Sequence, residues 1–348
     1  MSTKNAKLIL QRVLPLISCE PPVWAWNRHT QTILGEILPS PGLMTRGRKL
    51  VVRFPDGDRV VCRIYDQGSP TLVVLFHGLA GSTNSKYMQR VARELLNEGY
   101  SVCMMNHRNC GEGKGLAREI YHCGRSDDLG YTIANLRSHF PTQKIVALGF
   151  SMSANALLLL MSGVIPMKGV YTADHFRSVK KELGIEWPDL AIAINPPIDL
   201  SKTAQYFEHM TNRPYAAYFL SYLQQTIRDL SREKVLVKKP VPISWFMSIK
   251  EFDQQFTAPH SGFESSQDYY RKCSSKDHLR KIEQDTIIIT SQDDPFIPVE
   301  DFYGLHVSEK VSLHLENSGG HLGYIHREKT PQGTHRWLDY AVVETLKL

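Results

Sequence analysis

The stretch Lys144-Ile-Val-Ala-Leu-Gly-Phe-Ser-Met-Ser-Ala-Asn-Ala-Leu-Leu-Leu-Leu-Met161 changes character at Ser151. Residues 144–149 are an apolar run with the length and composition of a buried β-strand. Residues 154–161 are rich in Ala and Leu and favour a helix. A serine on so tight a strand-to-helix turn has a strained backbone that lifts its hydroxyl out of the sheet. The helix N-terminus lies beneath it and would stabilise negative charge there, so this pattern predicts a nucleophile.

The pattern around this serine, Gly149-Phe-Ser-Met-Ser153, departs from the usual form of such a turn, which has glycine at the last position. That glycine lets neighbouring backbone approach closely, and serine is the next smallest polar residue. The alternative interpretation is an ordinary serine that caps a helix N-terminus. The choice depends on whether the rest of the chain supplies partners for Ser151.

The bulk composition excludes several classes of protein. The 348 residues are 42% hydrophobic and 22% charged, which is ordinary for a globular chain of one large or two modest domains. The net charge of +6 is mild, and no basic run with interleaved aromatics indicates a nucleic-acid partner. No apolar stretch reaches the roughly 18 residues of a membrane span. The interrupted apolar segment Lys7–Cys19 predicts packing on the domain, with weak membrane-surface contact as the alternative.

Six cysteines are scattered along the chain, and none forms a C-x-x-C pair. With no secretory signal peptide, they predict reduced thiols in a cytoplasmic protein. Five possible metal ligands lie near one another in the sequence: Cys103, His107, Cys110, His122 and Cys123. Their spacing matches no common zinc pattern, so we expect neither a metal nor a cofactor.

Strand-like and helix-like segments alternate along most of the chain. Strands are expected at 50–54, 59–65, 71–76, 100–105, 144–149, 190–194, 285–290 and 311–316, and helices at 86–97, 127–139, 154–161 and from 334. The alternation predicts an α/β fold with a mostly parallel central sheet and helices on both faces.

The alternation stops between Pro196 and Glu283, where the chain is aromatic, charged and mostly helix-like. We therefore expect an inserted helical cap at the carboxyl ends of the strands, where ligands bind in such folds. The predicted division is an N-terminal extension (1–48) packed on the core, a core made of 49–195 and 285–348, and a cap (196–284).

A nucleophilic serine needs a base, and the base needs an acid to orient it. The acid should follow a late strand, and Ser291-Gln-Asp-Asp-Pro-Phe-Ile-Pro298 follows the strand at 285–290. Asp294 lies four residues before Pro298, the spacing of a D-x-x-x-P turn. Asp293 is the second choice, and a plain turn carboxylate is the alternative for either residue.

The base should lie on a loop after the last strand. Asn317-Ser-Gly-Gly-His-Leu-Gly-Tyr324 follows that strand, and glycines on both sides of His321 let the loop fold back toward the serine. His321 is the predicted base, because His314 lies inside the strand and His326 lies beyond the glycine-rich loop.

A tetrahedral intermediate requires two hydrogen-bond donors for its oxyanion. One should be the N–H of Met152, which follows the serine. The other should come from the loop after an early strand, and Phe76-His-Gly-Leu-Ala-Gly81 fits, with the N–H of Leu79 as the donor.

These residues, in this order, resemble the YheT-like branch of the α/β-hydrolases (AB hydrolase 4 family), which includes bacterial esterase-like proteins and eukaryotic lipid esterases. The resemblance runs from about Trp24 to Tyr324. The matching motifs are Asn27-Arg-His-Thr-Gln-Thr32, His77-Gly-Leu-Ala-Gly-Ser-Thr-Asn-Ser-Lys-Tyr87, Tyr121-His-Cys-Gly124, Asp127-Asp-Leu129, Glu251-Phe-Asp253, Thr257-Ala-Pro259, Gly262-Phe263, Tyr269-Tyr270, Asp293-Asp-Pro-Phe296 and Gly319-Gly-His321.

The resemblance implies an α/β-hydrolase fold and cofactor-free hydrolysis of carboxylic esters by Ser151, Asp294 and His321. The chain departs from the family at Ser153, Ala154 and Asn109, where glycines are usual. The first two bear on the geometry of the turn. The third lies near the expected pocket wall and bears on substrate fit.

The expected substrate is a small-molecule or lipid-like ester with an apolar short- to medium-chain acyl group. A set of cap aromatics are candidates to line its site, or simply to hold the cap on the core: Tyr206, Phe207, Tyr215, Tyr218, Phe219, Trp245 and Phe246. Three alternatives stay open: a thioesterase, an alcohol acyltransferase with the same acyl-serine, and a catalytically impaired binding protein on this scaffold.

Overall fold

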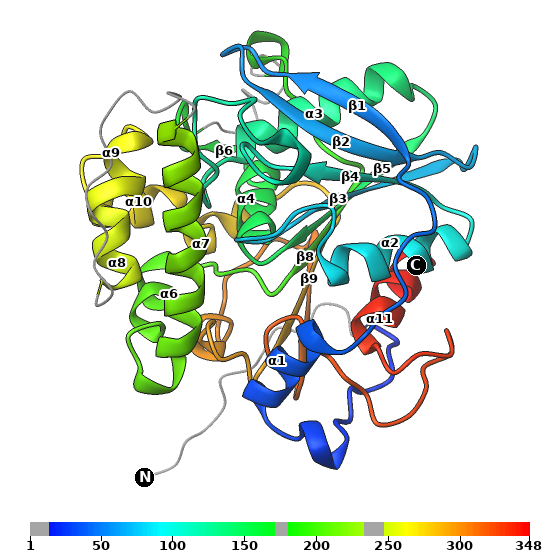
Figure 1. The fold of residues 1–348 in the computed structure, drawn as a ribbon. Helices are drawn as coiled ribbons and strands as arrows, with labels where there is room; N and C mark the ends of the chain where they lie inside the picture. Colours follow the sequence, from blue (N-terminus) through cyan, green and yellow to red (C-terminus); the bar gives the residue numbers. More distant parts are fainter. Residues whose placement is uncertain (1–13, 171–179, 233–246) are drawn as a thin grey trace.

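The computed structural model describes residues 14–170, 180–232 and 247–348. Its centre is an eight-stranded sheet in the order β1-β2-β4-β3-β5-β8-β9-β10 (Figure 1). The strands are β1 (Arg48–Arg53), β2 (Arg59–Tyr65), β3 (Thr71–Phe76), β4 (Ser101–Asn106), β5 (Lys144–Phe150), β8 (Leu190–Ile194), β9 (Thr286–Ser291) and β10 (Val311–Glu316). Strand β2 pairs antiparallel with β1 and β4, and all other neighbours are parallel, which confirms the predicted sheet.

Helices cover both faces of the sheet. One face packs against α3 (Ser126–His139) and α4 (Met152–Met161), and the other against α2 (Lys86–Asn97) and α11 (Trp337–Leu346). Successive side chains of β3 alternate between the two cores, with Val74 in the first and Val73 in the second. A strand buried on both sides has no polar face, and this is why residues 71–76 appear in the sequence as a continuous apolar run.

Two features were not predicted. The first is helix α1 (Arg28–Ile37), which lies in the N-terminal extension and begins with a capping box between Asn27 and Thr30. The second is a short hairpin of β6 (Val164–Ile165) and β7 (Gly169–Val170). The sequence of α1 is mostly polar, so apolar periodicity did not indicate it.

The described chain between β8 and β9 is helical. It contains α6 (Leu200–Tyr206), α7 (Arg213–Arg232), α8 (Ile249–Phe252), a π-helical turn (Asp253–Thr257), α9 (Ala258–His260) and α10 (Ser266–Cys273). Figure 1 shows these helices gathered on one side of the molecule, away from α2 and α11. We keep the division into extension, core and cap as a proposal.

Three further observations concern classes of protein considered above. Within residues 14–170, 180–232 and 247–348, no helix is long and apolar enough to cross a bilayer. All six cysteines are buried, unpaired thiols. The described residues contain no group of three or more His, Cys, Asp or Glu side chains that could hold a metal ion.

Candidate active site

Ser151 stands on the turn between β5 and α4 with a strained backbone. Its φ of 54° and ψ of −119° lie in a region that non-glycine residues rarely adopt. The turn is tight, since a Cβ on Gly149 would lie 2.7 Å from the carbonyl oxygen of Ser153. The loop after β3 comes equally close, because a Cβ on Gly78 would lie 3.1 Å from the Cβ of Ser151. These contacts hold the hydroxyl at the carboxyl edge of the sheet.

The three side chains expected to act together lie in hydrogen-bond contact. His321 Nε2 lies 3.0 Å from Ser151 Oγ, and His321 Nδ1 lies 2.7 Å from Asp294 Oδ2. A carboxylate accepts, so the imidazole carries its proton on Nδ1 and presents an unprotonated Nε2 to the serine. The ring of His321 also rests against that of Phe296, with centroids 4.7 Å apart.

The two competing carboxylates have different partners. Asp294 is buried, and its Oδ1 accepts from the N–H groups of Phe296 and Ile297 at 2.8 and 3.1 Å. Asp293 does not reach the imidazole and instead accepts from the N–H groups of Gly319 and Gly320 and from the hydroxyl of Ser318. Asp293 therefore shapes the loop that carries His321.

The other two histidines considered above bind elsewhere. His314 lies on β10 with its Nε2 3.2 Å from Glu316. His326 accepts at Nδ1 from the N–H of Glu20 at 2.9 Å.

The loop after β3 is held from two sides. The Tyr87 hydroxyl accepts from the N–H of Gly78 at 2.9 Å, and His77 Nδ1 donates to the carbonyl of Gly78 at 2.8 Å. Leu79 and Met152 both line the cavity in front of Ser151. Met152 is the first residue of α4, where an N–H has no partner in the helix. The N–H of Leu79 donates to no group in the described part of the chain.

Comparison with known proteins agrees with this architecture. The family model for the alpha/beta hydrolase fold matches residues 71–328. The chain belongs to the α/β-hydrolase family. It lies in the YheT-like branch: it is 29% identical over 320 residues to the candidate esterase YheT of Escherichia coli (strain K12), covering 86% of this chain and 84% of that protein.

Relatives of lower sequence identity include proteins that are named for reactions of lipids. Phospholipase ABHD3 of Bos taurus is 24% identical, over 88% of this chain and 72% of that protein. Medium-chain fatty acid ethyl ester synthase/esterase 2 of Saccharomyces cerevisiae is 24% identical, over 78% of this chain and 61% of that protein. Among solved structures, the Pyrococcus furiosus esterase Pf2001 superposes with a TM-score of 0.55 at 20% identity, covering 95% of this chain and 98% of that chain, and shares the fold.

Ser153, where this hydrolase departs from its family, is the centre of a buried polar network. Its Oγ lies 2.7 Å from His107 Nε2 and 2.9 Å from the Tyr121 hydroxyl, and it donates to the carbonyl oxygen of His77. The rings of His107 and Tyr121 are stacked, with centroids 3.9 Å apart. The serine hydroxyl thus joins the N-terminal turn of α4 to the loop that carries Leu79.

The Ser153–His107 contact is a second serine–histidine pair in the hydrolase, but it lacks what a nucleophile needs. Both side chains are fully buried, so no substrate reaches them. His107 Nδ1 has no partner in the described chain, and therefore no acid orients this imidazole. Burial, followed by the nearby His77, holds the pKa of His107 well below its usual value.

Asn109, another position where the family resemblance implies glycine, has a local structural role. Its φ of 60° lies in the left-handed region that favours glycine, and Asn is one of the few other residues that tolerates this region. Its side chain donates to the carbonyls of Ala117 and Glu119 and accepts from the N–H of Gly115. It lines neither cavity that contains Ser151 but lines a neighbouring one, whose walls share Leu79 and Tyr121 with the cavity in front of Ser151, so its effect on substrate fit stays a prediction.

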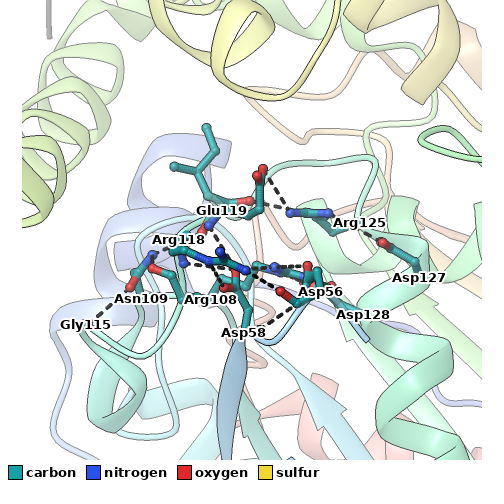
Figure 2. Close-up of polar contacts among 12 residues, drawn as sticks. Asp56, Asp58, Arg108, Asn109, Gly115, Arg118, Glu119, Arg125, Asp127 and Asp128 are labelled. Atoms are coloured by element: carbon teal, nitrogen blue, oxygen red, sulfur yellow. Dashed lines mark hydrogen bonds and ion pairs between the residues drawn. The ribbon is translucent and has the colours of Figure 1, made fainter. Parts of the chain in front are cut away.

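The neighbouring Arg108 anchors the same loop. Figure 2 shows its guanidinium between three carboxylates, at 2.7 Å from Asp56, 2.5 Å from Asp58 and 2.7 Å from Asp128. The arginine is fully buried, and these pairs raise its pKa above the usual value despite the desolvation that opposes this. The cluster fixes the loop between β4 and α3 to the hairpin that connects β1 and β2.

Sequence reasoning missed the support that α1 gives to His321. The hydroxyl of Thr32 accepts from the N–H of His321 at 2.9 Å. The amide of Gln31, fully buried, donates to the carbonyl of Ile325 and accepts from its N–H. A Cβ on Gly35 would lie 2.6 Å from the Cα of Gly323. The only signal in the sequence was the family motif at 27–32, which carries no chemistry by itself.

Asn195 was also missed. It follows β8 in a left-handed conformation (φ 46°), and its amide donates to Asp294 Oδ2 at 2.7 Å. The Tyr324 hydroxyl donates to its Oδ1 at 2.9 Å. The chain Tyr324–Asn195–Asp294 thus holds the same carboxylate oxygen that contacts the imidazole of His321.

The cap aromatics divide between several places. Phe207 and Phe219 line a cavity beneath the cap, and Tyr215, Tyr218 and Phe219 line a second cavity beside α1. Tyr206 lies against Glu300 instead. Trp245 and Phe246 lie outside the described residues.

Proposed function

We propose that this α/β-hydrolase is a serine hydrolase that cleaves carboxylic esters through an acyl-enzyme. The observation that carries the proposal is the continuous contact from Ser151 Oγ to His321 to the buried carboxylate of Asp294. This connectivity supplies a nucleophile, a base in the right tautomer and an acid that holds it. The relatives named as an esterase, a phospholipase and an ester synthase support the same class of reaction.

In the proposed reaction, Ser151 attacks the ester carbonyl while His321 Nε2 takes the hydroxyl proton. The N–H groups of Leu79 and Met152 stabilise the oxyanion of the tetrahedral intermediate. The imidazolium, paired with Asp294, then protonates the leaving alcohol. Water enters, loses a proton to the same imidazole and releases the acid.

We propose an apolar short- to medium-chain acyl ester as the substrate, since the cavity next to Ser151 is walled mostly by apolar side chains. A thioesterase or an alcohol acyltransferase would use the same acyl-serine, and the yeast relative named for ester synthesis favours keeping the second possibility. Product analysis with added alcohol separates them, because transfer yields a new ester and hydrolysis yields only the acid.

The test is covalent labelling with a fluorophosphonate probe together with turnover of p-nitrophenyl butyrate. The wild type should label and turn over. Ser151→Ala should lose labelling and about 1000-fold or more of turnover, while its melting temperature stays close to that of the wild type. An unlabelled wild type would instead indicate a binding protein, and a Ser151→Ala variant that keeps its activity would refute the nucleophile.

A further inference from the structure

Two separate cavities meet at Ser151 and His321. The first lies beneath the helices between β8 and β9 and is called here the cap cavity, with a volume of about 110 Å³. The second lies against α1 and is called the α1 cavity, with a volume of about 270 Å³. Their shared walls are Leu79, Ser151, Phe219, Phe296 and His321. An ester bound at Ser151 therefore has two distinct directions in which to place its two halves.

The residues that line the cap cavity are buried or half-buried. Its walls come mainly from apolar side chains such as Leu200, Ala204 and Ile249. The carboxyl of Asp253 also lies on its wall and accepts a hydrogen bond from the Tyr270 hydroxyl at 2.8 Å. An alkyl chain fits the apolar part of this space. Two of its lining residues also carry a buried polar atom that has no partner within the described residues, His122 Nε2 and Thr203 Oγ1.

The α1 cavity opens to solvent. Ile33 and Ile37 on α1 are 45% and 58% exposed, and Tyr218 on α7 is 61% exposed, although all three line it. Glu36, also exposed, lies on the same wall. A group that occupies this cavity can extend past α1 into water.

The order of an acyl-enzyme reaction distinguishes the two directions. The alcohol must leave and water must enter while the acyl group stays bound to the serine. The departing half therefore needs the cavity whose walls include exposed residues, whereas the retained half gains from the cavity whose walls are buried or half-buried. We infer that the cap cavity holds the acyl chain and that the α1 cavity holds the alcohol. This inference rests on the proposed function.

The assignment gives the N-terminal helix a role in specificity. The substrate class is an ester of an alkyl acid with an alcohol that can be bulky, and α1 forms part of the wall that contacts the alcohol. In the wild type, lengthening the alcohol from hexyl to decyl should change kcat/KM for acetate esters by less than threefold. The same lengthening of the acyl chain in ethyl esters should lower kcat/KM by tenfold or more.

The test uses two variants, each of which fills one cavity, and two esters. The six-carbon chain lies on the acyl side in ethyl hexanoate and on the alcohol side in hexyl acetate. Ala204→Leu narrows only the cap cavity, and Ile33→Trp narrows only the α1 cavity. Ala204→Leu should lower kcat/KM for ethyl hexanoate by tenfold or more and that for hexyl acetate by less than twofold. Ile33→Trp should give the reverse pattern. If the buried Ala204 variant misfolds, Ile249→Phe, at a half-buried position on the same cavity, replaces it.

The opposite pattern, or equal losses for both esters, would overturn the assignment while leaving the proposed function in place, provided that the wild type labels at Ser151 and hydrolyses both esters. A wild type that neither labels nor hydrolyses any ester would overturn the proposed function, and this inference with it.

Discussion

Asp293 and Asp294 are adjacent in the chain but have different partners. Asp294 holds the imidazole of His321, and Asp293 holds the loop on which that imidazole stands. The sequence offered both carboxylates and ranked them by a turn spacing. Only the contacts in the structure distinguish the two carboxylates, because the side chains of neighbouring residues point in different directions.

We expect the two amide variants to have different effects. Asp294→Asn should lower kcat by roughly 10³- to 10⁴-fold, because an amide no longer fixes the Nδ1–H tautomer. Asp293→Asn should lower kcat by tenfold or less and reduce the free energy of unfolding by about 1–3 kcal/mol, because two backbone donors lose a charged acceptor. Steady-state kinetics and urea unfolding check both, and equal kinetic losses would contradict the separation of roles.

Ser153 gives a second prediction at this scale. Ser153→Ala leaves His107 Nε2 without its buried partner, while the carbonyl of His77 keeps the Tyr121 hydroxyl as a donor, at a cost of about 1–3 kcal/mol in the free energy of unfolding. Because the lost bond ties α4 to the loop of Leu79, kcat should fall about fivefold or more while KM stays within twofold.

The matched control is Ser162→Ala on the same helix. That buried hydroxyl donates only to the carbonyl of Leu158 at 2.7 Å, far from the loop after β3. It should lose stability without a change in kcat. A Ser153→Ala enzyme with wild-type kcat would show that the network only stabilises the fold.

At the scale of elements, α1 is the part that sequence analysis underestimated. The 1–48 segment was expected to pack on the core, yet α1 contacts the loop of His321 through Gln31, Thr32 and Gly35. None of the apolar side chains of α1, which are Ile33, Leu34 and Ile37, is fully buried, so the helix lacks the apolar core face that a sequence pattern would reveal. The sheet and its covering helices were predictable, because burial on one or both faces imposes strong apolar patterns.

Thr32→Val tests whether α1 positions His321. The change keeps the shape of the side chain but leaves the N–H of His321 without its acceptor. We expect kcat to fall about tenfold with KM within twofold, and Thr32→Ser to restore it, since the hydroxyl returns. Steady-state kinetics with p-nitrophenyl butyrate measures both. A loss that Thr32→Ser does not rescue would assign the effect to packing.

At the scale of the whole molecule, buried titratable groups set the dependence of stability on pH. Burial lowers the pKa of His77 to about 4, and it lowers those of His107 and His122 well below 6.5. Each of these lowered pKa values stabilises the fold fully above pH 6.5. The stabilisation is lost as the pH falls from 6.5 toward the pKa of the folded state, because in that range only the unfolded chain takes up the proton. Burial raises the pKa of Asp127 and of Asp253 to about 6, which acts in the opposite direction between pH 3.8 and 6.

Burial also raises the pKa of Asp339 and lowers those of His29 and His278, so the imidazoles outnumber the opposing carboxyls. The unfolded chain then binds the excess protons, and each is worth about 1.4 kcal/mol per pH unit. We therefore expect the free energy of unfolding to fall by about 1–2 kcal/mol between pH 6.5 and 5. Urea unfolding at fixed ionic strength measures it. The variant Asp127→Asn, which mimics the protonated carboxyl, should show a steeper fall than the wild type, and a flat profile for both would contradict the balance.

The sequence by itself determined the strand-turn-helix around Ser151, the order of the proposed nucleophile, acid and base, and the alternation that builds the sheet. These are local or periodic features, because burial requires apolar side chains at regular positions along one strand or helix. Only the tertiary structure separated Asp294 from Asp293, gave Ser153 its buried partners, brought Thr32 and Asn195 to the site and opened two cavities at one serine. Those contacts join residues far apart in the chain, and no spacing along the sequence encodes the distance between them.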